Sequence, residues 1–238
     1  MALILCHSPT GGVGTTFLAA HLAQGLAARG HQVTAIDFTH ADALKLFFGV
    51  PPTQAVPSIG DEDGEGMIVE GVELLGGYDA AQNDRFAEAL TDPDSPLLHD
   101  DRIVIADVAS ADLATRDVLM AYATLHLCVL APQPASLAAL GKVQPGTPTI
   151  DLIATGFVLN LVDDARKLSR HAQAFLRELF GEGLIATVRR DEAVNEAMAS
   201  FQPVSRYAPQ SVVLPDLLAL AAAVEARCDL RLHADDML

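Results

Sequence analysis

Lysine is scarce in this 238-residue chain, and positive charge is scarce with it. Only three lysines occur, at positions 45, 142 and 167, and 15 basic residues stand against 31 acidic ones, which gives a net charge of −16. A chain this acidic repels nucleic-acid phosphates and anionic lipid surfaces. The charge balance therefore counts against non-specific DNA binding and leaves proteins as the expected partners.

Long apolar runs and cysteine clusters are also missing. No apolar stretch reaches the roughly 18 residues that a membrane-spanning helix needs, and the first apolar run is too short for a signal peptide. Cys6, Cys128 and Cys228 form no CxxC pair, and the histidines are scattered, so no Cys/His metal site is expected. The end of the sequence, Asp235–Leu238, lacks a basic amphipathic helix. We expect a cytoplasmic protein with reduced thiols and no direct membrane insertion.

Half of the residues are hydrophobic, and they gather in short runs that alternate with helical patterns. The runs that predict buried strands are Ala2–Cys6, Gln32–Ile36, Val72–Leu75, Arg102–Asp107, Leu125–Leu130, Gly156–Asn160 and Leu184–Val188. The patterns that predict helices are Phe17–Ala28, Ala81–Leu90, Asp112–Tyr122, Ser136–Leu140, Asp163–Phe180 and Ser211–Ala226. Strands that are apolar along their whole length belong to a sheet covered on both faces. No segment has the composition of an interdomain linker, so residues 1–238 are expected to form one domain.

A glycine-rich stretch, Ser8-Pro9-Thr10-Gly11-Gly12-Val13-Gly14-Thr15-Thr16, joins the first strand to the first helix. Glycines let the backbone turn its N–H groups inward, and the N-terminus of a helix adds partial positive charge. Strand, glycine loop and helix in this order predict a phosphate-binding loop. The alternative is a turn that merely connects the two elements.

Polar residues stand at the ends of three predicted strands. Asp37 follows Gln32–Ile36, Asp107 ends its strand, and Asn160 ends another. In open parallel sheets, ligands bind at the carboxyl ends of the strands. The two aspartates could hold Mg²⁺ partly through water, or they could cap a turn and end a buried strand. A strand-end asparagine taken alone is more often a turn former.

The glycine loop resembles the deviant Walker A loop of the ParA/MinD family, whose usual form is K-G-G-x-G-K-[ST]-[ST]. Here Thr10 and Thr15 stand at the two lysine positions and Phe17 at the second hydroxyl position, while Thr16 keeps the hydroxyl that would bind Mg²⁺. Thr39 stands where the family has a second aspartate, which orients the attacking water. His40 or Asp42 could substitute for it, and the residues alone do not decide between them.

The resemblance implies an α/β fold, a three-layer doubly wound and mostly parallel sheet of about seven strands with helices on both faces. It implies ATP and Mg²⁺ as ligands. The implied nucleotide-binding residues are Thr10, Gly11, Gly12, Val13, Gly14, Thr15, Thr16 and Phe17, then Asn160 on the adenine, then Arg189, Arg190 and Asp191 beside it. The implied Mg²⁺ residues are Thr16, Asp37 and Asp107. Arg189 or Arg190 could also supply a cation from a partner subunit.

Within that family, the chain is most similar to the cellulose-biosynthesis accessory proteins of BcsQ (YhjQ) type. They share the Gly-Gly-Val-Gly-Thr-Thr loop, the Arg-Asp-Glu-Ala at 190–193 and the Gln-Pro-Val at 202–204. This resemblance implies a nucleotide-sandwiched homodimer that regulates or scaffolds cellulose synthesis and secretion. Its implied partners are subunits of the secretion apparatus and small cytoplasmic proteins, which would place it at the periphery of the inner membrane.

Hydrolysis is expected to be slow or absent, because transition-state charge on the γ-phosphate needs placed cations and both loop lysines are missing. Two alternatives stay open. One is a nucleotide-free pseudo-ATPase that serves as a structural subunit, and the other is an active ATPase switch that positions proteins.

Overall fold

The computed structural model describes residues 2–61, 66–91, 102–140 and 155–230. These residues form one sheet of eight strands in the order β3-β4-β2-β5-β1-β6-β7-β8. The strands are β1 (Ala2–His7), β2 (Val33–Asp37), β3 (Met67–Val69), β4 (Val72–Gly76), β5 (Ile103–Asp107), β6 (Leu125–Leu130), β7 (Thr155–Val162) and β8 (Leu184–Arg189). Neighbouring strands run parallel, except that β3 is antiparallel to β4.

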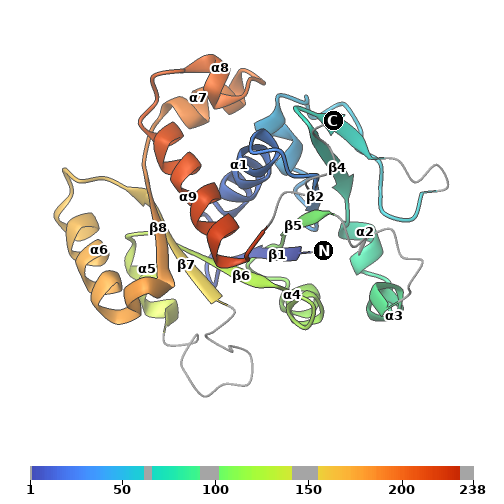
Figure 1. Ribbon diagram of the computed structural model, residues 1–238, viewed down its shortest axis with the longest axis horizontal. Coiled ribbons are helices and arrows are strands. Elements are labelled where there is room, and N and C mark those ends of the chain that lie inside the picture. Colours follow the sequence, from blue (N-terminus) through green and yellow to red (C-terminus); the bar gives the residue numbers. More distant parts are fainter. Residues whose placement is uncertain (1, 62–65, 92–101, 141–154, 231–238) are drawn as a thin grey trace.

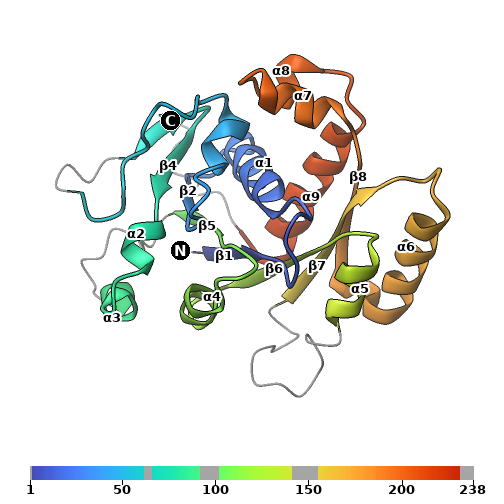
Figure 2. The ribbon, with the colours of Figure 1, turned by 180° about the vertical axis from the view of Figure 1, so that it is seen from behind.

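Helices connect the strands and cover both faces of the sheet. They are α1 (Thr15–Ala28), η1 (Leu44–Phe48), α2 (Tyr78–Ala81), α3 (Phe86–Thr91), α4 (Leu113–Met120), α5 (Pro134–Ala139), α6 (Lys167–Phe180), η4 (Gly181–Gly183), α7 (Ala193–Ala199), α8 (Val204–Tyr207) and α9 (Val213–Arg227). Figures 1 and 2 show α1 and α9 on one side of the sheet and α3, α4 and α5 on the other. The structure is the three-layer α/β fold that the sequence predicts.

The core is divided by the sheet, as the alternation of side chains along each strand requires. On the α1 side, Ile4 and Cys6 of β1 pack with Leu18 and Leu22 of α1 and with Leu220 of α9. The opposite face has two clusters. One joins β1, β2 and β5 to α3 and α4, and the other joins β6 and β7 to α6. Every residue of β1 is buried, because the strand lies in the middle of the sheet with helices on both faces.

The strand order reverses at β1, and this reversal positions the glycine loop. From β1 the chain builds the sheet outward through β6, β7 and β8 on one side and through β5, β2 and β4 on the other. In open parallel sheets, ligands bind at the carboxyl ends of the strands where the order reverses. His7 ends β1, so the loop leaves the sheet at that point.

The boundaries differ from the predicted ones in a few places. The sheet has one strand more than the sequence predicts. This strand, β3, is an edge strand in which only three residues pair, antiparallel to β4. The helix predicted over 81–90 is two short helices, α2 and α3, and Asn83 caps the segment between them by accepting a hydrogen bond from the Arg85 amide. Lys142 and the acidic end at 235–238 lie outside the described residues. Within the part of the chain that is described, no helix is long and apolar enough to cross a membrane.

Candidate functional site

The glycine loop has a fixed shape that depends on Ser8 and on two glycines. The Ser8 hydroxyl donates to the Thr10 carbonyl (2.8 Å) and accepts from the Thr10 amide (3.2 Å). Gly12 and Gly14 adopt positive φ values of 74° and 83°, which L residues rarely tolerate. Gly14 stands directly before α1, and its carbonyl accepts the first helical bond, from Leu18. Thr15 and Thr16 therefore occupy the first turn of α1, where backbone N–H groups have no partner within the helix.

Only the backbone of Phe17 belongs to the predicted nucleotide-binding loop, because its side chain turns into the protein interior. Its ring is buried and packs against His21 (ring centroids 4.5 Å apart) and Phe47 (5.8 Å). The Phe17 carbonyl accepts a hydrogen bond from Nδ1 of His21 (2.9 Å), and burial lowers the pKa of His21 to about 4. The loss of a hydroxyl at position 17 is thus accompanied by an aromatic contact that ties α1 to η1.

Asp37 and Asp107 are neighbours at the carboxyl ends of β2 and β5, as predicted. They are paired in the sheet register, and Asp107 is also paired with Cys6 of β1. Both carboxylates are buried. Asp37 is occupied, because its oxygens accept from the amides of Thr39 (2.8 Å) and Leu44 (3.0 Å). It therefore caps the turn that leads into η1, which is the alternative role that its position in the sequence allowed.

Asp107 is unpaired by comparison. It is 1% exposed, and neither of its carboxylate oxygens accepts a hydrogen bond from a described residue. Burial, and then the charge of Asp37, raise its pKa to about 8, while the nearby Thr16 hydroxyl offsets part of the rise. An unpaired buried carboxyl group is costly, so its position beside Thr16 and below the glycine loop calls for a cation or a proton.

The two substitutes for the missing second aspartate are both engaged in other contacts. The Asp42 carboxylate pairs with Lys45, whose buried ammonium also donates to the Gln54 carbonyl (2.9 Å). The His40 ring packs edge-on against Tyr78, with centroids 5.1 Å apart. Among the described residues, no three His, Cys, Asp or Glu side chains gather as a metal-binding group.

Asn160 lies beneath the glycine loop. Its side-chain Nδ2 donates to the Val13 carbonyl (2.8 Å), and its Oδ1 is buried with no partner among the described residues. A Cβ on Gly14 would come within 2.4 Å of Nδ2. The structure therefore brings together the loop, Thr16, Asp107 and Asn160, and the Asn160 amide, expected on the adenine, contacts the loop backbone.

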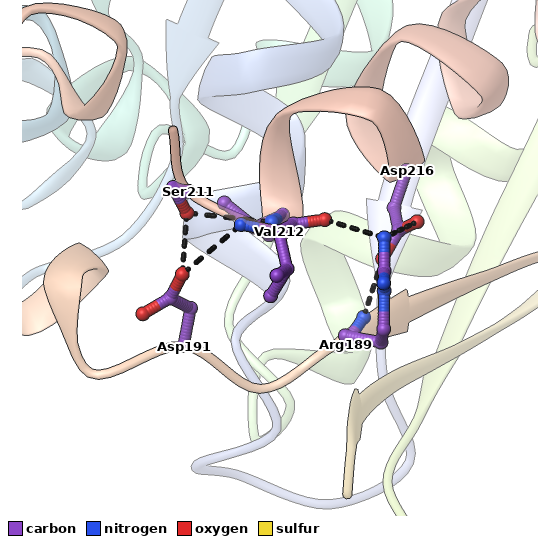
Figure 3. Close-up of polar contacts among 6 residues, drawn as sticks. Arg189, Asp191, Ser211, Val212 and Asp216 are labelled. Carbon is purple, nitrogen blue, oxygen red and sulfur yellow. Dashed lines mark hydrogen bonds and ion pairs between the residues drawn. The ribbon is translucent and has the colours of Figure 1, made fainter. Parts of the chain in front are cut away.

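Arg189 and Asp191, predicted beside the base, are tied to the start of α9 (Figure 3). The Arg189 guanidinium donates to both oxygens of Asp216 (2.8 and 2.9 Å) and to the Val212 carbonyl (2.7 Å). Asp191 accepts from the Ser211 hydroxyl (2.6 Å), the Ala193 amide (3.0 Å) and the Val212 amide (3.2 Å), and these bonds lower its pKa. Arg189 therefore links β8 to the start of α9, and its guanidinium is not free to bind a ligand.

Arg190 is the more accessible of the two neighbouring arginines. Its backbone amide donates to the Val162 carbonyl (2.8 Å), which continues the β7–β8 pairing, and its side chain is half exposed. It lines a cavity of about 110 Å³ together with Pro132, Leu161 and Arg166. Two guanidinium groups thus border a small hollow beyond the ends of β6, β7 and β8.

Two buried histidines, His7 and His126, were not singled out from the sequence. Their rings lie 5.9 Å apart, and neither Nε2 atom has a partner among the described residues. Burial and the charge of Arg116 lower the pKa of His7 to about 4, and burial, His7 and Arg116 lower that of His126 to about 3. The available signal was their place directly after (His7) or inside (His126) an apolar strand run, which predicts neutral buried imidazoles.

Comparison with known proteins places this geometry in a family. A model of the CobQ/CobB/MinD/ParA nucleotide binding domain (CbiA) matches residues 4–204. No curated protein matches the chain in sequence.

Solved structures resemble it in fold. A putative plasmid partition protein from Borrelia burgdorferi B31, bound to AMPPNP, has a TM-score of 0.72 and 14% identity, with 95% of this chain and 99% of that one covered. A ParA family ATPase from Chlorobium tepidum TLS has a TM-score of 0.70 and 17% identity, with 93% of this chain and 97% of that one covered. The septum site-determining protein MinD from Pyrococcus horikoshii OT3, complexed with Mg-ADP, has a TM-score of 0.68 and 21% identity, with 94% of this chain and 96% of that one covered. Because the family model spans most of the sequence, this chain belongs to the CobQ/CobB/MinD/ParA nucleotide binding domain family.

Proposed function

We propose that this protein binds Mg-ATP as a nucleotide-sandwiched homodimer, with weak or no hydrolysis, and that it regulates or scaffolds bacterial cellulose synthesis and secretion. The observation that carries the nucleotide part is the unpaired, buried Asp107 carboxyl group beside Thr16, below a glycine loop at the start of α1. Backbone N–H groups and the dipole of a helix favour phosphate there.

The residues present fit a magnesium ion. Mg²⁺ prefers oxygen ligands, and Thr16 supplies a hydroxyl oxygen while Asp107 supplies a carboxylate with no other partner. When bound, the ion would neutralise part of the phosphate charge. The Asp37 oxygens already accept hydrogen bonds from two backbone amides. Asp37 would therefore contact the ion through water, or influence it only through the charge it adds beside Asp107.

Weak hydrolysis follows from what surrounds the loop. Thr10 and Thr15 bring no charge, Thr39 cannot act as an anionic acceptor for water, and the Asp42 carboxylate is paired with Lys45. Arg189 is engaged by Asp216, whereas Arg190 makes a longer and exposed ion pair with Glu192 (3.7 Å) and is the more accessible cation near the β8 end for a nucleotide or a partner subunit. Placed cations are worth several orders of magnitude in phosphoryl transfer.

Relatives support the ligands and a protein partner. The Pyrococcus MinD is complexed with Mg-ADP, the Borrelia protein with AMPPNP, and an Aquifex aeolicus MinD with MinC. The net charge of −16 disfavours nucleic acid as a partner of this chain. The cellulose assignment rests on the shared loop, on Arg190–Ala193 and on Gln202–Val204, and it implies partners among the secretion-system subunits and small cytoplasmic proteins at the inner membrane.

One observation favours a nucleotide-free pseudo-ATPase as the second candidate. The Asp37 oxygens and the Nδ2 group of Asn160 already have hydrogen-bond partners within the protein, as a purely structural subunit would have them. Light scattering on a sizing column, with and without Mg-ATP, separates the two candidates when the nucleotide in each peak is quantified. A dimer with about one nucleotide per chain, lost in Asp107→Asn, is the expected result. A nucleotide-free monomer in every run would overturn the nucleotide function.

The pathway needs a separate test. Affinity purification of the tagged chain from cells that make cellulose should recover subunits of the synthase apparatus, and the Asp107→Asn variant should recover fewer. Deletion of the gene should lower cellulose output. Unchanged output together with no recovered subunit would remove the cellulose assignment and leave the nucleotide function standing.

A further inference from the structure

The helix α6 is fastened to the sheet by one of its faces. Leu176 is fully buried and packs with Phe157 and Leu159 of β7, and the Phe180 ring stacks on Phe157 with centroids 3.7 Å apart. Small residues, Ser169 and Ala172, fill the rest of the buried face. These contacts attach the helix to the sheet without help from its other side chains.

A second set of apolar side chains on α6 stays in solvent. They are Leu168, Phe175 and Leu179, which are 46%, 51% and 53% exposed. Spacings of seven and four residues place them on one line along the helix, which spans about 16 Å. Single exposed apolar residues are ordinary on a protein surface, whereas a contiguous apolar patch marks an interaction site. We call these three residues the α6 stripe.

Positive charge gathers on the same helix. Lys167, Arg170 and Arg177 are exposed, and none of them makes an ion pair with a described carboxylate. Arg170 donates only to a backbone carbonyl, that of Asp164. The chain has 31 acidic residues against 15 basic ones, yet the acidic side chain within this helix is Glu178 alone. The outer surface of α6 is therefore apolar and cationic on a strongly acidic protein.

This combination favours one kind of occupant. A second copy of the chain is disfavoured, because pairing two α6 helices about a two-fold axis would set cations against the same cations. An anionic membrane attracts cationic amphipathic helices, but it repels a body with a net charge of −16. A helix that lays its apolar face on the stripe and its carboxylates beside the cations meets neither obstacle.

We propose that α6 is a docking surface for an acidic amphipathic helix of a partner protein. Apolar side chains of that helix pack on the α6 stripe, and its carboxylates pair with the three cations. The surface lies on the opposite face of the sheet from α1, beside β7 and β8 at the end of the sheet (Figures 1 and 2). The proposal therefore needs neither a bound nucleotide nor the cellulose assignment.

Fluorescence anisotropy with a labelled peptide tests the surface directly. The probe is a helical peptide of about 16 residues made of Glu, Ala and Leu, with Leu on one face, long enough to cover the stripe. Wild type should bind it, and Phe175→Ser should bind about tenfold more weakly, as loss of an aromatic contact at an interface predicts. The double variant Arg170→Glu/Arg177→Glu should also bind more weakly, and its affinity should depend less on salt.

Matched controls separate this surface from general stickiness. A scrambled peptide of the same composition should not bind. Leu218→Ser removes an equally exposed leucine (59%) from α9 and should leave binding unchanged. Thermal melts should show that Phe175→Ser remains folded, because the ring it removes lies in solvent. No binding by wild type, or an equal loss in Leu218→Ser, would overturn the proposal.

Two further measurements decide between the occupants. Light scattering should give the same mass for wild type and Phe175→Ser, and a dimer that becomes a monomer in this variant would make the stripe an interface between copies instead. Flotation with phosphatidylglycerol vesicles should leave the protein unbound, and binding lost in Phe175→Ser would make the surface a membrane contact. Peptide binding should be the same with and without Mg-ATP, so a failure of the nucleotide function leaves this result standing.

Discussion

Two regions at the carboxyl edge of the sheet differ in whether their polar side chains have hydrogen-bond partners. Beside β1 and β5, the Asp107 carboxyl group is buried without a full partner, and the Thr10 hydroxyl is buried unpaired as well. Beside β8 and α9, the Arg189 guanidinium and the Asp191 carboxylate find partners at Ser211, Val212 and Asp216. The first region is incomplete without something else, and the second is complete by itself.

This difference separates a binding region from a supporting one. Buried polar groups in native proteins are nearly always satisfied, so each exception marks strain, function or a missing ligand. The satisfied region around α9 rigidifies the end of β8. The unsatisfied region beside the glycine loop holds the groups on which a ligand would act.

The sharpest test of the contrast is Asp107→Asn. We expect the Mg-ATP affinity to fall about 100-fold, the upper range for loss of a group that supports a metal site. Stability of the ligand-free protein at pH 8 should rise, because the variant no longer buries an ionisable carboxyl group. Calorimetry and thermal melts measure the two effects, and a variant that loses both affinity and stability would contradict the assignment of Asp107 as an unsatisfied ligand group.

The raised pKa of Asp107 predicts that the folding stability of the ligand-free protein depends on pH. An acid with a folded pKa of about 8 and an unfolded pKa of about 4 holds its proton more tightly in the folded state. Folding stability of the ligand-free protein should therefore decline as pH rises through this window, and the contribution should vanish in Asp107→Asn. Binding of Mg-ATP at pH 7 should release close to one proton, which titrations in buffers of different ionisation enthalpy will measure.

Adding charge at the incomplete region should strengthen binding. Thr15→Lys returns a cation to the first turn of α1, and we expect Mg-ATP to bind about tenfold more tightly, a gain of about 1.4 kcal/mol. Hydrolysis should stay slow because Thr39 is unchanged. Thr91→Lys, on the exposed end of α3, is the control for charge alone. Equal gains in both variants would show that net charge and not position sets the affinity.

The smallest effect is expected in the completed region. Arg189→Ala, Asp216→Ala and the double variant form a cycle that should give a coupling of about 1 kcal/mol in unfolding free energy, because the pair is bidentate but partly exposed. Denaturant unfolding measures it. A coupling near zero would mean that the α9 network adds no stability and that the contrast between the regions is only geometric.

Local patterns predicted most of the fold. Largely apolar runs such as Leu125–Leu130 predicted the buried strands, and the family resemblance drawn from the glycine loop is confirmed by the family model. β3 escaped prediction because three residues carry too little periodicity to stand out. The start of α6 was placed too early because Asp163 looks like a helix residue, whereas it turns the chain ahead of Lys167 by accepting from the Ala165 amide.

The site was predictable where each residue carries a local signal, such as a glycine motif or the end of an apolar strand. The loop and the aspartates at strand ends could be found by their order along the chain. The bonds from Asn160 to Val13 and from Arg189 to Asp216 join residues 147 and 27 positions apart, and no spacing rule announces them.

The central place of β1 has a consequence for how the chain is made. Ala2 pairs with Ile103 and Ile4 with Leu125, so β1, once synthesised, must wait for residues about 100 positions later before it has neighbouring strands. The anchor of the glycine loop, Asn160, arrives later still. Such long-range pairing slows folding and leaves apolar strands unpaired for a time. Nascent chains that end before β7 should therefore be the species that chaperones hold most tightly.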